Sequence, residues 1–141
     1  MGSHYARWLH VSDRLPQDGA LHRGQIVLVE LDPARGSEQG TTRPAILVSN
    51  DATNSAAAQN DYGVVTVVPI TGNTLSIRPY QLLVRAEDSG LPVDSKAQAE
   101  QVRSIAAVRI VRTLGMLPLR VVTELDEAVR ASELVMRMSR H

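Results

Sequence analysis

The sequence contains no cysteine, which excludes disulfides, thiolate catalysis and cysteine-based zinc sites. It also contains no phenylalanine, one tryptophan and three tyrosines, so its core must consist of aliphatic side chains. No apolar run approaches the roughly 18 residues that are needed to span a bilayer. The N-terminal segment lacks the apolar centre of a signal peptide. These absences favour a cytoplasmic protein with no membrane partner.

The formal net charge is +0, so general attraction to nucleic acid is not expected. Of the cationic residues, only Lys96 is not an arginine. The planar guanidinium suits phosphate recognition, although a codon bias toward arginine is the better explanation of the count. Any affinity for an anionic ligand must therefore come from a local group of arginines.

The histidines lie outside the apparent body of the domain, at positions 4, 10, 22 and 141, and none has metal-ligand spacing. The sequence also lacks a phosphate-binding loop, a dinucleotide fingerprint and a nucleophile elbow. An enzyme with this sequence would work without a metal or cofactor, through arginines, carboxylates, hydroxyls and backbone groups.

A chain of 141 residues is expected to form one domain. Residues 1–22 have the character of a leader, and their first four, MGSH, are typical of an expression tag. The domain is then expected at 23–138. Apolar and β-branched runs predict strands at 25–31, 44–50, 64–70, 80–86 and 109–118.

Residues 96–106 are ambiguous, because their composition favours helix whereas their position among strands favours strand. Pro118 suits the first position of a helix. Val122, Leu125, Val129 and Met136 then recur near helical spacing. Asp126 with Arg130, and Glu133 with Arg137, have the i,i+4 spacing of helical ion pairs. The pattern predicts a mainly β (α+β) fold, a small barrel or curled sheet with a C-terminal helix.

Two stretches could support chemistry. Arg43 lies between the polar segment GSEQGTT and the strand PAILVSN. A guanidinium there could stabilise charge on a phosphate, or simply pair with a carboxylate such as Glu38. Thr71, in PITGN, follows a strand, where its hydroxyl could face a ligand or only shape a turn. Taken alone, each residue is better explained by the structural alternative.

Together these stretches are more specific. The order RGQIVLVELDPARGSEQGTTRPAILVSND, VVTVVPITGN and AEQVRSIAAVRI resembles the MazF/PemK family of toxin endoribonucleases, from Arg23 to about Met136. The resemblance implies an SH3-like, PemK-like small β-barrel that forms a two-fold homodimer. It also implies metal-independent cleavage of single-stranded RNA, neutralisation by a MazE-like antitoxin, and a strand at Ala97–Ile105.

The resemblance also implies residue roles. Arg43, Thr71 and Glu38 occupy the catalytic positions. Substrate contacts fall on Ser37, Asn50, Gln101 and Arg103. Arg35 and Arg78 are further candidates from their charge rather than from the resemblance, and Arg78 could equally be a solvated loop charge. The implied reaction is attack of the RNA 2′-hydroxyl on the adjacent phosphate, which gives a 2′,3′-cyclic phosphate and a 5′-hydroxyl. A guanidinium is a poor proton acceptor at neutral pH, so Arg43 is assigned to charge stabilisation and Glu38 to proton transfer.

Three features differ from many relatives. The first strand, IVLVEL, has no aromatic residue for base stacking, which is worth about 1–3 kcal/mol per base where it occurs. The loop after the third strand carries Ser76, Ile77 and Arg78 in place of a lysine or an aromatic residue, and the net charge is zero. Two alternatives stay open: a toxin of the same fold that poisons DNA gyrase by protein contact, and a degenerate dimer that only binds an antitoxin.

Overall fold

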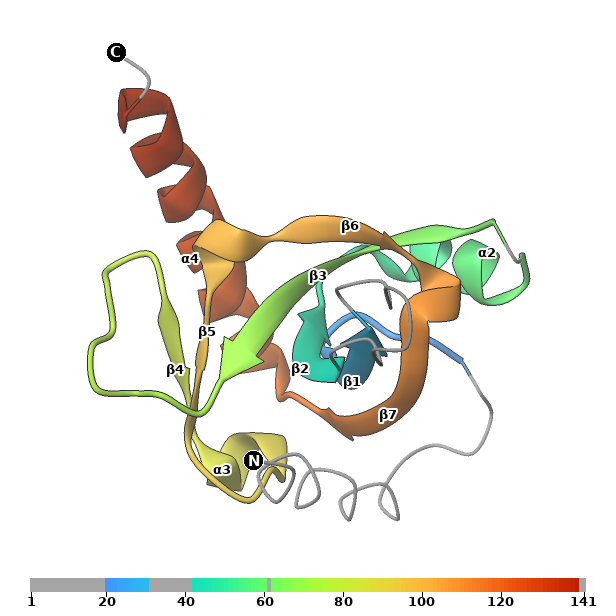
Figure 1. Cartoon of the computed structure of the whole chain (residues 1–141), viewed down its shortest axis with the longest axis horizontal. Helices are drawn as coiled ribbons and strands as arrows, with labels where there is room; N and C mark the ends of the chain where they lie inside the picture. Colours follow the sequence, from blue (N-terminus) through green and yellow to red (C-terminus); the bar gives the residue numbers. More distant parts are fainter. Residues whose placement is uncertain (1–19, 31–41, 61, 140–141) are drawn as a thin grey trace, which may run out of the picture.

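An antiparallel sheet curls toward a barrel, and a long C-terminal helix packs against one side of it (Figure 1). The structure is a computed structural model that describes residues 20–30, 42–60 and 62–139. The mainly β fold with a C-terminal helix is confirmed. Its strands are β1 (Gln25–Glu30), β2 (Thr42–Leu47), β3 (Val64–Thr71), β4 (Leu82–Val84), β5 (Ser95–Ala97), β6 (Arg103–Ala106) and β7 (Ile110–Met116). Its helices are α2 (Asp51–Ala58), α3 (Ala86–Ser89), the 3-10 turns η2 (Ala99–Gln101) and η3 (Ala107–Arg109), and α4 (Leu119–Ser139).

The strands follow the order β4-β5-β3-β2-β1-β7, and β6 pairs with β3 beside β5. Every pairing is antiparallel. The chain passes from β6, on β3, to β7, on β1, through the single turn η3. Within the described ranges β6 and β7 do not pair with each other, so the sheet curls toward a barrel without closing.

Strand β1 is buried on both faces, as its nearly continuous apolar sequence predicts. Ile26 and Leu28 face an outer core that includes residues of α4. Val27 and Val29 face an inner core inside the curl of the sheet. Leu21, which the sequence pattern places in the leader, is also buried in that inner core.

Helix α4 begins directly after Pro118, as predicted. Its buried face consists of Val121, Val122, Leu125, Ala128 and Ser132. Met136 does not continue this face, because 50% of its surface is exposed.

The ion pair of Asp126 also differs from the expected one. Its carboxylate pairs with Arg23, just before β1, so this contact fastens the sheet to α4. Among the described residues no ion pair joins Asp126 to Arg130.

The ambiguous segment 96–106 contains both kinds of structure. Strands β5 and β6 are separated by η2, so the expectation of a strand across Ala97–Ile105 is only partly correct. Gln98 donates its backbone N–H to the carbonyl oxygen of Pro69 at 2.9 Å, and η2 follows directly. The turn allows the chain to pair with β3 twice, first through β5 and then through β6.

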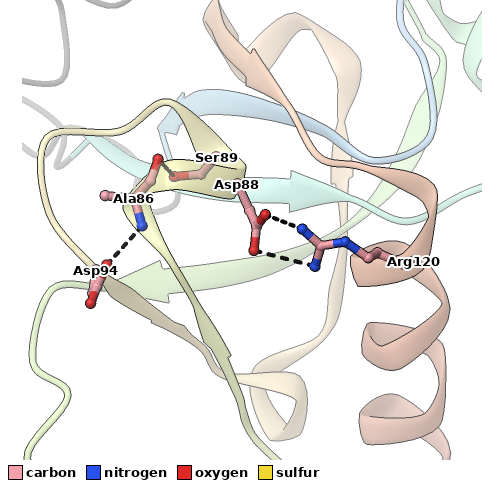
Figure 2. A network of polar contacts seen from close by, with 5 residues as sticks. All are labelled: Ala86, Asp88, Ser89, Asp94 and Arg120. Carbon is pink, nitrogen blue, oxygen red and sulfur yellow. Dashed lines mark hydrogen bonds and ion pairs between the residues drawn. The ribbon is translucent and has the colours of Figure 1, made fainter.

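A polar network fastens the short helix α3 between β4 and α4 (Figure 2). Arg120, in the first turn of α4, makes a forked ion pair with Asp88 of α3. The pKa of Arg120 is raised, chiefly by its hydrogen bond to Asp88 and secondly by the negative charge of the Asp88 carboxylate. Asp94 accepts the backbone N–H of Ala86 at 2.7 Å, which fixes the start of the same helix. The sequence predicted no helix at α3, and the predicted strand 80–86 ran into the first residue of this helix.

Candidate functional site

Arg43 is an exposed residue near the start of β2 and pairs with Val29 of β1. Pro44 follows it and is buried. Residues two apart in a strand share a face, so Arg43 continues the row formed by Ala45 and Leu47 along the inner core. The buried strand holds the backbone of Arg43, while its side chain remains open to solvent.

Thr71 is the last residue of β3 and is half-buried. Its hydroxyl oxygen accepts the backbone N–H of Asn73 at 3.3 Å, so it also begins the turn that follows. On one edge of β3, Thr71 pairs with Lys96 of β5. The other edge of β3 pairs with β2.

The register of β2 and β3 relates the two candidate catalytic residues. Ala45 pairs with Pro69, and Leu47 pairs with Val67. Continuing this antiparallel register by two residues assigns Arg43 and Thr71 to opposite positions. Residues in opposite positions share a face of the sheet. The fold therefore directs a guanidinium and a hydroxyl to one end of the inner core, an arrangement that suits the binding of one phosphate.

Three further candidates lie near β3 in the sheet or in the chain. Arg103 begins β6 opposite Val67, on the edge of β3 away from β2, and Gln101 ends η2 just before it. Arg78 lies in the connection between β3 and β4. Arg103 and Arg78 are both exposed.

Asn50 lies beyond the opposite end of β2 from Arg43, roughly 20 Å along an extended chain. Its side chain accepts the backbone N–H of Thr53 at 2.8 Å and caps the start of α2. The structure thus gives Asn50 a structural contact and does not bring it beside Arg43. Glu38, Ser37 and Arg35 lie outside the described residues.

Lys96 and Glu100 were not among the sequence candidates. Lys96 lies directly opposite Thr71, and Glu100 lies in η2. Lys96 is the single lysine in an arginine-rich chain, and that could have drawn attention to it. No pattern in the sequence pointed to Glu100.

The described ranges offer neither a metal site nor a membrane span. No group of three or more histidine, aspartate or glutamate side chains is placed there to hold a metal ion. No helix in the same ranges has the length and apolar character required to cross a membrane.

Comparisons with known proteins identify the class of this fold. Residues 22–132 match the profile of the PemK-like, MazF-like toxins of type II toxin-antitoxin systems. Endoribonuclease MazF9 of Mycobacterium tuberculosis is 49% identical over 110 residues, which cover 78% of this chain and 93% of that protein. The chain belongs to the PemK-like, MazF-like toxin family.

Solved structures agree with this assignment. A MazE-MazF crystal structure (Form-II) from Deinococcus radiodurans superposes with a TM-score of 0.65 at 25% identity, covering 81% of this chain and 96% of that chain. A mycobacterial endoribonuclease in complex with its cognate antitoxin gives a TM-score of 0.61 at 19% identity, covering 80% and 94%. At that lower identity the second likeness concerns the fold alone.

Proposed function

We propose that this protein is an endoribonuclease toxin that cuts single-stranded RNA at short sequences and so inhibits translation and growth. The observation that supports the proposal is the β2–β3 register, in which Ala45 pairs with Pro69; extended by two residues, that register would set Arg43 opposite Thr71. Its membership of the toxin family and its 49% identity to an endoribonuclease support the same activity. We place this activity in the cytoplasm, where RNA is available.

The reaction uses a nucleophile that the substrate supplies. The RNA 2′-hydroxyl oxygen bonds to the adjacent phosphorus, and the bond from phosphorus to the 5′ oxygen breaks. One product ends in a 2′,3′-cyclic phosphate and the other in a 5′-hydroxyl. The 2′-hydroxyl loses one proton and the leaving 5′ oxygen gains one, so no metal, cofactor or oxidant is required for balance.

The residue roles follow from their chemistry. The guanidinium of Arg43 stabilises the negative charge that develops on the phosphate, through parallel hydrogen bonds. It also donates the proton to the leaving oxygen. Thr71 orients the phosphate. Glu38 accepts the proton of the 2′-hydroxyl, since arginine is a poor base.

Substrate contacts are assigned to arginines and polar residues around this centre. In support of this set, Arg103 pairs with Val67 of β3, Gln101 ends η2 just before β6, and Arg78 follows β3 in the chain. Ser37 and Asn50 join the proposed set through the family resemblance, and Arg35 joins it through its charge. Because the net charge is +0, attraction to RNA depends on Arg35, Arg43, Arg78 and Arg103 as a local group.

The partners are proposed from the family. A solved relative is an endoribonuclease in complex with its cognate antitoxin, and we propose a MazE-like antitoxin for this protein. We also propose a homodimer. An antitoxin bound over Arg43 and Thr71 would block cleavage, because it would occupy the surface that we propose for RNA.

The decisive test is incubation of the purified protein with a long defined RNA in EDTA, beside Arg43→Ala, with both ends of each product mapped. We expect discrete cuts with 5′-hydroxyl ends from the wild type only. Cleavage that requires a divalent metal, or that persists in Arg43→Ala, would contradict the proposal. Absence of cleavage across several RNAs would instead favour a toxin that acts through protein contact or an antitoxin-binding dimer.

The role of Glu38 has a separate test. Glu38→Gln keeps the size of the side chain but removes its basicity. We expect a large loss of cleavage rate with little change in RNA binding. An unchanged rate in this variant, combined with loss of activity in Arg43→Ala, would show that another group accepts the proton.

A further inference from the structure

The connection between β3 and β4, residues 72–81, leaves the sheet at Thr71 and projects beside β4 (Figure 1). It presents large side chains to solvent. Leu75 is 96% exposed, Ile77 is 40% exposed, and Arg78 is also exposed. An apolar and cationic loop beside the proposed centre is suited to contact an RNA chain.

Lys96 fastens the first half of this connection. It pairs with Thr71 at the end of β3, and its ammonium nitrogen donates to the carbonyl oxygen of Ser76 at 2.8 Å. Thr71, Lys96 and Ser76 thus connect the end of the strand, the neighbouring strand and the loop. In the described part of the chain the side chain of Lys96 forms no ion pair, and its polar contact is the hydrogen bond to the Ser76 carbonyl oxygen.

A second contact fastens the other half. Gln81 accepts the backbone N–H of Arg78 at 3.0 Å and donates its side-chain amide to Glu100 at 2.7 Å. Glu100 lies in η2, between β5 and β6. The loop is therefore held in its first half by Lys96 and in its second half by Glu100, which Gln81 contacts.

We propose that Lys96 is a positioning residue that holds the 72–81 loop at the end of β3, so that Arg78 meets RNA bound at Thr71. The inference rests on the proposed function, and it concerns substrate binding rather than the chemical step. A loop already held in one conformation loses less conformational entropy when it binds a ligand. Lys96 acts through the Ser76 carbonyl and Arg78, and the Gln81–Glu100 contact supports the same geometry.

The kinetic experiment compares Lys96→Met, which removes the donor, with Lys96→Arg, which retains one. The control Arg130→Met removes one exposed positive charge from α4. For cleavage of a short RNA that contains the mapped site, we expect Lys96→Met to raise KM about tenfold and to leave kcat within about threefold. Lys96→Arg should restore most of the affinity, and Arg130→Met should leave both parameters unchanged.

A double-mutant cycle separates positioning from direct contact. If Lys96 acts by presenting Arg78, then Arg78→Ala should raise KM much less in the Lys96→Met background than in the wild type. Fully additive effects would show that Lys96 contacts RNA on its own and would overturn the inference.

A measurement without RNA keeps the inference testable if the protein proves not to cut RNA. Hydrogen–deuterium exchange should become faster in residues 72–78 of Lys96→Met, with the melting temperature nearly unchanged. Unchanged exchange in this loop would overturn the positioning role. Absence of RNA cleavage by the wild type, with faster loop exchange in the variant, would refute the proposed function alone.

Discussion

Arg23 and Asp126 are separated by 103 positions in the chain and form an ion pair that joins the start of the sheet to α4. The backbone N–H of Arg23 also donates to Asp51 of α2 at 2.7 Å. One residue just before β1 therefore contacts both of the longer helices. Each side chain of the ion pair is about one-third exposed, at 35% and 30%.

Removal of this ion pair should have a small but measurable effect on stability. We expect Asp126→Asn and Arg23→Met each to lower the free energy of unfolding by about 1 kcal/mol, with a coupling that weakens at high salt. Urea unfolding of the single and double variants measures the coupling. As a control, the double-mutant cycle of Asp126→Asn with Arg130→Met should give a smaller coupling free energy than the cycle of Asp126→Asn with Arg23→Met. Equal coupling free energies in the two cycles would favour the Asp126–Arg130 pair that the sequence suggested.

Thr71 offers a test of the hydroxyl in the proposed centre. Thr71→Ser retains the oxygen and should cleave RNA within about tenfold of the wild type. Thr71→Val keeps the shape but removes the polar contact to phosphate, so we expect kcat to fall by about 10²–10³. Single-turnover cleavage with saturating protein measures the step. Because Thr71 also accepts the N–H of Asn73, circular dichroism of both variants must show an intact fold.

Asn50 has a capping contact in the structure and a proposed contact with RNA, and two substitutions separate them. Asn50→Ala should lower the free energy of unfolding by about 1 kcal/mol, because the N–H of Thr53 loses its acceptor. Asn50→Asp retains the cap but adds a negative charge, so we expect stability to be kept and KM for RNA to rise. An unchanged KM in Asn50→Asp would limit this residue to the cap.

Gly63 has no room for a side chain. A Cβ at this position would lie 2.7 Å from the Cβ of Ala57 and closer still to the backbone of that residue. We expect Gly63→Ala to destabilise the protein by about 1–3 kcal/mol, because α2 must move away from the start of β3. Thermal unfolding measures this loss, with the exposed substitution Ala58→Ser as the control. Adding Ala57→Gly should rescue only part of it, since the clash with the backbone of residue 57 would persist.

The strands were predictable where burial alone decides the pattern. The predicted ranges 25–31 and 64–70 match β1 and β3 closely, and the start of α4 follows Pro118. Segments whose structure depends on distant partners were less predictable. Strand β4 is shorter than expected, helix α3 was not predicted, and turn η2 interrupts the strand expected across Ala97–Ile105. Their geometry depends on contacts such as Arg120 with Asp88, which local sequence does not encode.

The candidate site was predictable as a set of residue types but not as an arrangement. Motif order identified Arg43 and Thr71, whereas their opposite placement depends on the register of β2 and β3. Lys96 was missed because its significance arises from pairing with Thr71 across strands. Glu38, Ser37 and Arg35 lie outside the described residues, and the roles of all the candidate residues are proposals.

The pairing of β1 with β7 has a consequence for synthesis of the chain on the ribosome. Gln25 pairs with Met116, so β1 receives one of its two neighbouring strands only after most of the chain has been made. Arg43 and Thr71 both emerge earlier. The nascent protein therefore carries both catalytic candidates before β1 has its second neighbouring strand, and contacts this distant in sequence are slow to establish. The final placement of β1 in the sheet should thus wait until β7 has left the ribosome.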